Sequence, residues 1–347
     1  FEVKTKALYD KLPVAFQMIR ELLMESKFED EKRLEEILAL LKSRLQMKFQ
    51  SSGHMTAVLR AMSYRSPMSQ FKDLTNGIAF YEKVCQIADH FEEEKATLIA
   101  NLKKLSEQIF RADNMIISCT SRKEGLEELE KLIGELKDGI YQGTAEHTPC
   151  ILRCEKKNEG FQTASKVQYV ARTGNFMEEG LAYTGALQIL KVILSYDYLW
   201  QNIRVKGGAY GCMSNFNRIG DGYFVSYRDP NLEKTNEVYE GITEYLRNFD
   251  VDDRDMKKYI IGTISNMDVP MTPATKGERS MNLYMNHVSK EMIEQERKEV
   301  LDAKVSDIRA LADIVEAVLK AGDLCVVGSE EKIEAQKELF MEIKNLA

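Results

Sequence analysis

The chain has 347 residues, which is enough for two domains. Its 44% hydrophobic and 30% charged residues are typical of a globular protein and exclude a disordered chain, a collagen-like repeat and a disulfide-stabilised miniprotein. The net charge of −7 argues against nucleic acid as a general partner, and no apolar run approaches the roughly 18 residues of a membrane span, so we expect no membrane partner either.

The chain begins with a short apolar segment and two stretches with helical periodicity. Apolar residues recur at helical spacing over 16–23 and again over 34–41, which predicts two amphipathic helices. The acidic segment Phe28–Glu31 lies between them and predicts the start of the second helix. The group Ser51 to His54 follows, and we interpret it as a turn between helices.

None of the four histidines belongs to a complete zinc motif. His90 begins a near match to H-x-x-E-H, but Glu94 stands where the second histidine is needed, so a solvated charged helix is the favoured interpretation. A nucleophile elbow, a Walker loop and a G-x-G-x-x-G fingerprint are also missing from the sequence.

Residues 114–120 predict a buried strand, and residues 123–129 predict a helix with an acidic first turn. The stretch from Asp138 to Glu146 contains Gly139 and Gly143 and is the best candidate for a domain boundary. We therefore divide the chain into a first domain, 1–140, and a second domain, 141–347.

The second domain predicts a complete α+β unit, with a mainly antiparallel sheet and helices on one face. Its predicted strands are 166–172, 209–217, 223–228 and 324–329, and the turn 218–222 joins the second and third in a hairpin. Its predicted helices cover 178–198 and 232–268, then the region from the loop 270–277 to Lys320, and a final helix from Glu330.

The two domains match as an internal repeat. When Phe1 is aligned with Phe224, the apolar stripes of 16–23 and 34–41 coincide with those of 239–246 and 257–264. The strand–turn–helix of 114–129 matches the one that begins at Leu324 at a slightly shorter offset. Residues 150–223 have no counterpart in the first copy. We therefore expect the first domain to be a helix-rich copy, truncated at its N-terminus and lacking its first strands.

Six cysteines occur mostly within apolar runs, which predicts buried free thiols in a reducing compartment. They are Cys85, Cys119, Cys150, Cys154, Cys212 and Cys325. His147 lies close to Cys150 and Cys154 in sequence, but a linker histidine with two core thiols explains this group better than a metal site does. We therefore expect no metal bound by this chain.

The segment 200–211 is the strongest candidate site. A helix carries Arg204 near its end, Gly207 and Gly208 break that helix, and a strand opens with Ala209 and Tyr210. Arg204 and Tyr210 are candidate donors to a carbonyl or carboxylate, and the glycines allow a second backbone to approach closely. The alternative is a capped helix whose arginine interacts with the helix dipole, with Tyr210 packed in the sheet.

This segment resembles the C-terminal half of the pitrilysin/insulinase clan of zinc peptidases, in particular the subfamily that contains the presequence proteases. The resemblance rests on Leu199–Gly211, with the sequence LWQNIRVKGGAYG, and is supported by Val167–Asn175 and Ser51–His54. It extends over essentially the whole chain. Members of the clan consist of related α+β domains in two halves that close around an unfolded peptide.

The resemblance implies that this chain is the non-catalytic half of a zinc metalloendopeptidase. The N-terminal half of such an enzyme carries H-x-x-E-H and the zinc, and this chain departs from the whole enzyme because it lacks that motif. Arg204 and Tyr210 correspond to the arginine and tyrosine that reach the substrate near the scissile bond. Gly207, Gly208 and Ala209 are the associated candidate substrate-binding residues. The partners implied are the N-terminal half of the same polypeptide and unfolded peptides.

Two hypotheses follow from the resemblance. In the first, the chain is one half of a single-chain peptidase, inactive alone, with zinc only in the other half. In the second, it is a natural metal-free subunit that pairs with a separate catalytic chain. Both predict an intracellular protein, either cytoplasmic or in an organellar matrix. The peptides cleaved are not evident from the sequence.

Overall fold

The computed structural model describes residues 1–144 and 149–346. They form two compact units, each assembled from separate stretches of the chain. The first unit comprises Phe1–Leu41, Val84–Cys150 and Met271–His287, and the second comprises Lys42–Lys83, Ile151–Pro270 and Val288–Ala347. Each described helix is too short or too polar to cross a membrane.

The first unit is helical where the structure describes it. Helix α1 (Leu12–Met24) packs against α6 (Leu126–Asp138) through apolar residues at helical spacing, including Leu12, Leu129 and Leu132. The unit also contains α5 (Phe91–Ile109), α11 (Pro273–Met285) and the short helices η1 (Tyr9–Lys11), η2 (Ala112–Asn114) and η3 (Lys123–Gly125). Helices α2 (Glu31–Ser63) and α4 (Ile78–Asp89) continue from one unit into the other.

The strand predicted at residues 114–120 is wrong. Beyond η2 these residues have no regular structure, and Ile116 is 60% exposed. A strand needs a neighbour that satisfies its backbone groups. Among the described residues of this unit, the strand-like pairing is limited to an isolated bridge between Arg111 and Tyr141. An apolar run without such a neighbour does not form a strand.

The second unit contains a six-stranded mixed sheet in the order β3-β4-β2-β5-β1-β6, which confirms the predicted α+β class. Pairs β3–β4, β4–β2 and β2–β5 are antiparallel, whereas β5–β1 and β1–β6 are parallel. The strands are β1 (Glu159–Thr163), β2 (Tyr169–Asn175), β3 (Gly211–Phe216), β4 (Asp221–Tyr227), β5 (Asp323–Ser329) and β6 (Glu342–Asn345).

The predicted strands in this unit are confirmed, with shifted ends. The hairpin joins β3 to β4, and Gly220 supplies the positive φ of 90° that its turn requires. Strands β1 and β6 were not predicted from the sequence. They are short and largely polar, so neither shows the alternation that indicates a strand.

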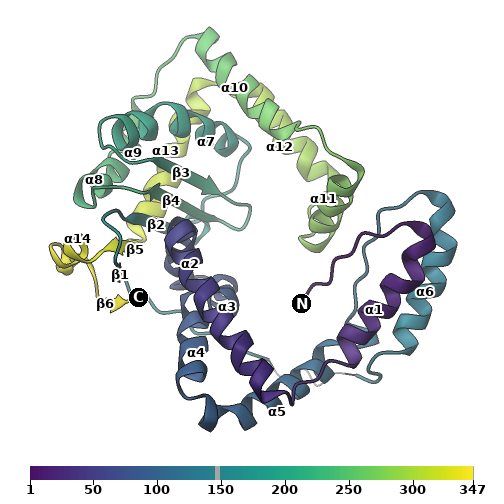
Figure 1. The fold of residues 1–347 in the computed structure, drawn as a ribbon. Coiled ribbons are helices and arrows are strands. Elements are labelled where there is room, and N and C mark those ends of the chain that lie inside the picture. The colour runs from purple at the N-terminus through teal and green to yellow at the C-terminus, as the bar shows by residue number, and fades with distance from the viewer. Residues whose placement is uncertain (145–148, 347) are drawn as a thin grey trace. The chain divides into compact units, whose positions relative to one another are not determined.

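One face of the sheet is covered by helices α7 (Ala186–Tyr196), α9 (Ile242–Arg247) and α13 (Val305–Lys320) (Figure 1). Val170, Phe224 and Val326 point from the strands into this core. Further helices of the unit are α8 (Glu233–Glu240), α10 (Asp253–Met267), α12 (Lys290–Asp302) and α14 (Glu330–Glu334), with the short helices η4 (Phe176–Glu179) and η6 (Lys337–Leu339). The layer of helices on this face agrees with the sequence prediction.

The single helix predicted over residues 178–198 is divided in the structure. Helix η4 ends at Gly180, which has a φ of 76°, and α7 begins only at Ala186. Gly185 lies against the backbone of Glu296, where an added Cβ atom would approach the carbonyl oxygen to 2.5 Å. The close approach at Gly185 and the left-handed Gly180 explain why the chain does not stay helical here.

Residues 42–83 cover the opposite face of the sheet, although we assigned them to the first domain. This stretch contains the second part of α2, which bends at Ser52, then α3 (Pro67–Asn76) and the start of α4. The Tyr64 hydroxyl accepts a hydrogen bond from the Glu159 backbone N–H at 3.3 Å, and the Arg60 guanidinium lies 5.7 Å from the Phe161 ring centre. The division at residue 140 into two family domains stays a prediction.

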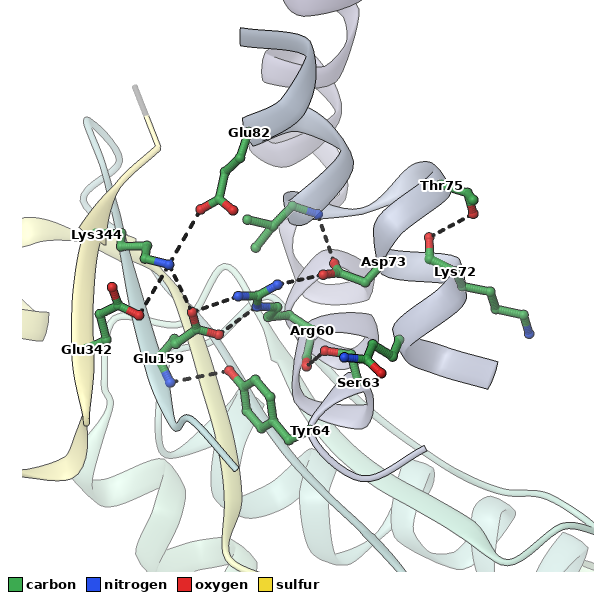
Figure 2. A network of polar contacts seen from close by, with 12 residues as sticks. Arg60, Ser63, Tyr64, Lys72, Asp73, Thr75, Glu82, Glu159, Glu342 and Lys344 are labelled. Atoms are coloured by element: carbon green, nitrogen blue, oxygen red, sulfur yellow. Dashed lines mark hydrogen bonds and ion pairs between the residues drawn. The ribbon is translucent and has the colours of Figure 1, made fainter. Parts of the chain in front are cut away.

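A buried cluster of charges joins these helices to the sheet (Figure 2). Arg60 donates from Nε and Nη2 to the Glu159 carboxylate at 2.6 and 2.8 Å, and from Nη1 to Asp73 at 2.6 Å. Lys344 of β6 lies 3.4 Å from the same Glu159 carboxylate. Burial alone would raise the pKa of Glu159, but its hydrogen bonds with Arg60 outweigh burial and lower it.

The six cysteines form no disulfide in the structure. The prediction that most of them are buried is wrong, because only Cys325 is buried. Cys119 and Cys150 are exposed, and Cys85, Cys154 and Cys212 have intermediate exposure. Cys119 is exposed because its segment, 114–120, does not form the buried strand expected there.

Candidate functional site

The helical segment that carries Arg204 is a π-helix, η5 (Trp200–Val205). The Lys206 N–H donates to the Gln201 carbonyl at 3.0 Å, a bond that spans five residues instead of the four of an α-helix. Ile203 points into the core, and Arg204 is exposed on the other side. The predicted helix with Arg204 near its end is present, in this wider form.

Gly207 and Gly208 end this helix for two different reasons. An added Cβ atom at Gly207 would lie 2.5 Å from the Ile203 carbonyl oxygen, so the turn leaves no room for a side chain. Gly208 has a φ of 79°, which other residues rarely adopt. Its surroundings are open, since an added Cβ atom would meet only Pro230, at 3.6 Å.

Ala209 and Tyr210 lead into β3, which begins one residue later than predicted, at Gly211. The Ala209 side chain is buried in the core, so only its backbone is near the exposed surface. The Tyr210 N–H donates to the Tyr227 carbonyl at 3.0 Å, which fixes the backbone of Tyr210 beside β4. The Tyr210 side chain is 66% exposed and is therefore not packed in the sheet.

The structure brings Arg204 and Tyr210 together. The Arg204 guanidinium carbon lies 5.7 Å from the centre of the Tyr210 ring and 4.0 Å from the centre of the Trp200 ring. Among the described residues, no carboxylate pairs with Arg204, and the Tyr210 hydroxyl has no hydrogen-bond partner. Both groups are thus available as donors to a ligand.

Three further rings lie behind Tyr210, and the sequence did not assign them to the site. Tyr227 packs edge-on against Tyr210 with ring centres 5.8 Å apart, and Tyr169 and His54 lie 5.6 and 4.9 Å from Tyr227. The His54 Nδ1 atom is buried without a hydrogen-bond partner among the described residues. Burial lowers the pKa of His54.

His54 lies within α2, directly after the bend at Ser52, so the predicted turn is a bend inside one helix. The two tyrosines are on facing strands of the sheet, and only the strand order brings them to the same place as His54. Alternation along β2 and β4 gives the face of each tyrosine but not which strands are neighbours.

The described residues contain no group of three or more His, Cys, Asp or Glu side chains that could hold a metal ion. His90 is exposed at the start of α5, next to the exposed Glu92 and Glu93. His147 lies outside the described residues, so the suggested group with Cys150 and Cys154 is not tested. The side chains present therefore do not fit the zinc site that the resemblance places in the other half of such enzymes.

Comparisons with known proteins agree with the resemblance. Residues 158–330 match the family model "PreP C-terminal domain", and residues 1–87 match the model of the domain associated with subfamily C of the M16 peptidases. The chain belongs to the presequence-protease branch of the pitrilysin clan. It corresponds to the C-terminal part of these proteins.

Two curated relatives illustrate the similarity. Protein HypA of Clostridium perfringens is 36% identical over 99% of this chain and 35% of its own length. Presequence protease 1, chloroplastic/mitochondrial, of Arabidopsis thaliana is 26% identical over 99% of this chain and 32% of its own length. The chain thus spans about a third of the length of the curated relatives it matches.

Solved structures show the same fold at low sequence identity. A peptidase M16 inactive domain from Pseudomonas fluorescens covers 92% of this chain, with 74% of its own chain aligned, at 14% identity and a TM-score of 0.58. A crystal structure of pitrilysin covers 91% of this chain, with 33% of its own chain aligned, at 12% identity and a TM-score of 0.51. The presequence-protease branch therefore shares its fold with other M16 peptidases.

Proposed function

We propose that this chain is the part of a zinc-dependent metalloendopeptidase that holds peptide substrates and carries no catalytic metal of its own. The observation that carries the proposal is the exposed pair Arg204 and Tyr210, whose donor groups have no partner among the described residues. Presequence proteases of plants, fungi and animals among the relatives support a substrate that is an unfolded peptide.

Each residue of the pair has a distinct task in this proposal. The Arg204 guanidinium offers forked N–H donors that bind a backbone carbonyl of the peptide. The Tyr210 O–H donates to the carbonyl oxygen of the bond being cleaved, where negative charge develops in the transition state. A donor held in place before the reaction stabilises that charge without reorganisation.

The backbone around Gly208 completes the proposed substrate site. The open space at Gly208 allows an extended peptide to approach the main chain of this protein closely. Gly207 contributes by the turn that it permits, and Ala209 through its backbone, because its side chain is buried.

The rest of the proposed enzyme lies outside this chain. We assign the zinc ligands and the general base to the N-terminal part of a longer protein, since the chain spans about a third of its relatives. The two parts would close around the peptide in an intracellular or organellar compartment, as the names of the mitochondrial and chloroplastic relatives suggest.

Steady-state cleavage of an unfolded peptide by the full-length protein tests the proposal. Tyr210→Phe is expected to lower kcat by about tenfold to a hundredfold with little change in KM, because the lost hydrogen bond forms mainly in the transition state. Arg204→Lys is expected to lower kcat/KM as well, since an ammonium group cannot replace a forked donor.

Tyr196→Phe is the matched control, because Tyr196 is 68% exposed, close to the 66% of Tyr210, and lies elsewhere in the same unit. It should leave turnover unchanged. The melting temperature of each variant should match that of the parent protein. Turnover within about twofold of the parent for Tyr210→Phe would contradict the proposal.

A further inference from the structure

Trp200 is the only tryptophan in the chain, and its ring lies against the guanidinium of Arg204. The distance of 4.0 Å from the guanidinium carbon to the ring centre is well within the range of a cation–π contact. Trp200 is 38% exposed, so the ring is at the surface and not a core residue.

The π-helix explains why the two side chains stack. Trp200 and Arg204 are four residues apart in η5. The wider turn of a π-helix brings residues at this spacing more nearly into line along the axis than an α-helix does. Single π turns of this kind are often found at functional sites.

A stacked guanidinium keeps its hydrogen-bonding edge free. The cation–π contact uses the flat face of the group, whereas the N–H donors point outward in its plane. Arginine has many rotamers, and no described carboxylate holds this one in place. The indole ring is therefore the group that restricts where the donors of Arg204 point.

We propose that Trp200 is a positioning residue that acts through Arg204, orienting the guanidinium toward the peptide substrate. This inference rests on the proposed function, in which Arg204 binds the peptide backbone. It adds a specificity for arginine at position 204, because an ammonium group at that position would have neither the flat face nor the fixed donors.

A double-mutant cycle in the full-length protein tests the inference. Trp200→Leu is expected to lower kcat/KM for an unfolded peptide by about five- to tenfold, and Trp200→Phe by no more than about twofold, because phenylalanine keeps an aromatic face. In an Arg204→Ala background, Trp200→Leu should have almost no further effect, since its action passes through the missing guanidinium.

Tryptophan fluorescence of the 347-residue chain gives a second readout that does not depend on activity. Arg204→Ala should shift the emission of the single tryptophan, whereas Arg254→Ala, at an exposed position in α10, should not. Addition of the unfolded peptide should change the emission of the parent chain, and Arg204→Ala should abolish that change.

The outcomes separate this inference from the proposed function. If Arg204→Ala leaves kcat/KM unchanged, the proposed function is wrong, and the role of Trp200 is lost with it. If Arg204→Ala is damaging but Trp200→Leu costs the same factor with and without Arg204, the proposed function stands and the positioning role is wrong. A loss of activity in Trp200→Leu with a lowered melting temperature that Trp200→Phe shares equally would also overturn it, since it would indicate a packing role.

Discussion

Tyr210 shows how much a single exposed fraction decides. The sequence left it either as a substrate contact or as a ring packed in the sheet, because both interpretations fit a residue next to a strand. In the structure the backbone of Tyr210 is bound to β4 while 66% of the residue is exposed. A ring so exposed contributes little to the core, so its removal should cost little stability.

His54 gives a prediction about pH at the same scale. Its pKa is lowered by burial from the usual 6.5, so the folded protein disfavours the protonated form. Above pH 6.5 both states are neutral and His54 contributes no pH dependence. As the pH falls below 6.5, the unfolded chain takes up the proton first, so the free energy of unfolding decreases until the folded state is protonated too.

His54→Gln should remove this part of the pH dependence. Denaturant unfolding of the parent and the variant at several pH values between 8 and the acid limit measures it, and the difference in unfolding free energy should change only on the acid side of about 6.5. His90→Gln, at an exposed position, controls for the substitution itself. A difference between parent and His54→Gln that is constant with pH would contradict the assignment.

The candidate site was predictable from sequence only in part. Arg204, the glycine pair and Tyr210 are close in sequence, so a local motif suffices to join them. Tyr169, Tyr227 and His54 come from two strands and a helix that are far apart in the chain, and their proximity depends on the strand order. The stacking of Trp200 depends on a π turn, which no residue pattern in the segment indicates.

At the scale of elements, the longest helix shows where sequence periodicity reaches its limit. The apolar stripe at 34–41 predicted a helix there, and α2 does run from Glu31 to Ser63. The periodicity gave no indication that its second part packs on the sheet of the second unit. That placement follows from the need to cover the second face of a buried sheet and from the Arg60 cluster.

Arg60 should therefore be critical for stability. Arg60→Met would leave the carboxylates of Glu159 and Asp73 buried without their partner and should cost about 3–5 kcal/mol in unfolding free energy. Urea denaturation followed by circular dichroism measures the loss. The matched control is Arg297→Met, which removes a similar two-bond pair with Asp268 at the surface and should have a far smaller effect.

Restoring a consistent apolar cluster should recover part of the lost stability. In Arg60→Met with Glu159→Gln and Asp73→Asn, no unpaired charge remains on the two former partners of Arg60, and Lys344 keeps Glu342 and Glu82 within ion-pair distance. A single Arg60→Met variant as stable as the parent protein would show that the cluster does not hold the helices to the sheet.

At the scale of the whole molecule, the pieces of one enzyme need not each be active. This chain spans about a third of its curated relatives, and its described residues contain no cluster able to hold a metal ion. Its donors are at the surface with no acceptor of their own. A donor group without a metal and a base stabilises a charge that the chain alone has no means to create.

We therefore expect the purified, tag-free 347-residue chain to bind no stoichiometric zinc and to cleave no unfolded peptide. Metal analysis after dialysis, with peptide cleavage followed by mass spectrometry, measures both, and the full-length protein prepared in parallel is the positive control. The chain should nevertheless bind the peptide, because Arg204, Tyr210 and the open backbone at Gly208 are all present. One zinc per chain would contradict the expectation, and its loss in His147→Ala would then assign the metal to the segment before Cys150. Cleavage by the metal-free chain would instead show that Arg204 and Tyr210 belong to a different chemistry from the one proposed.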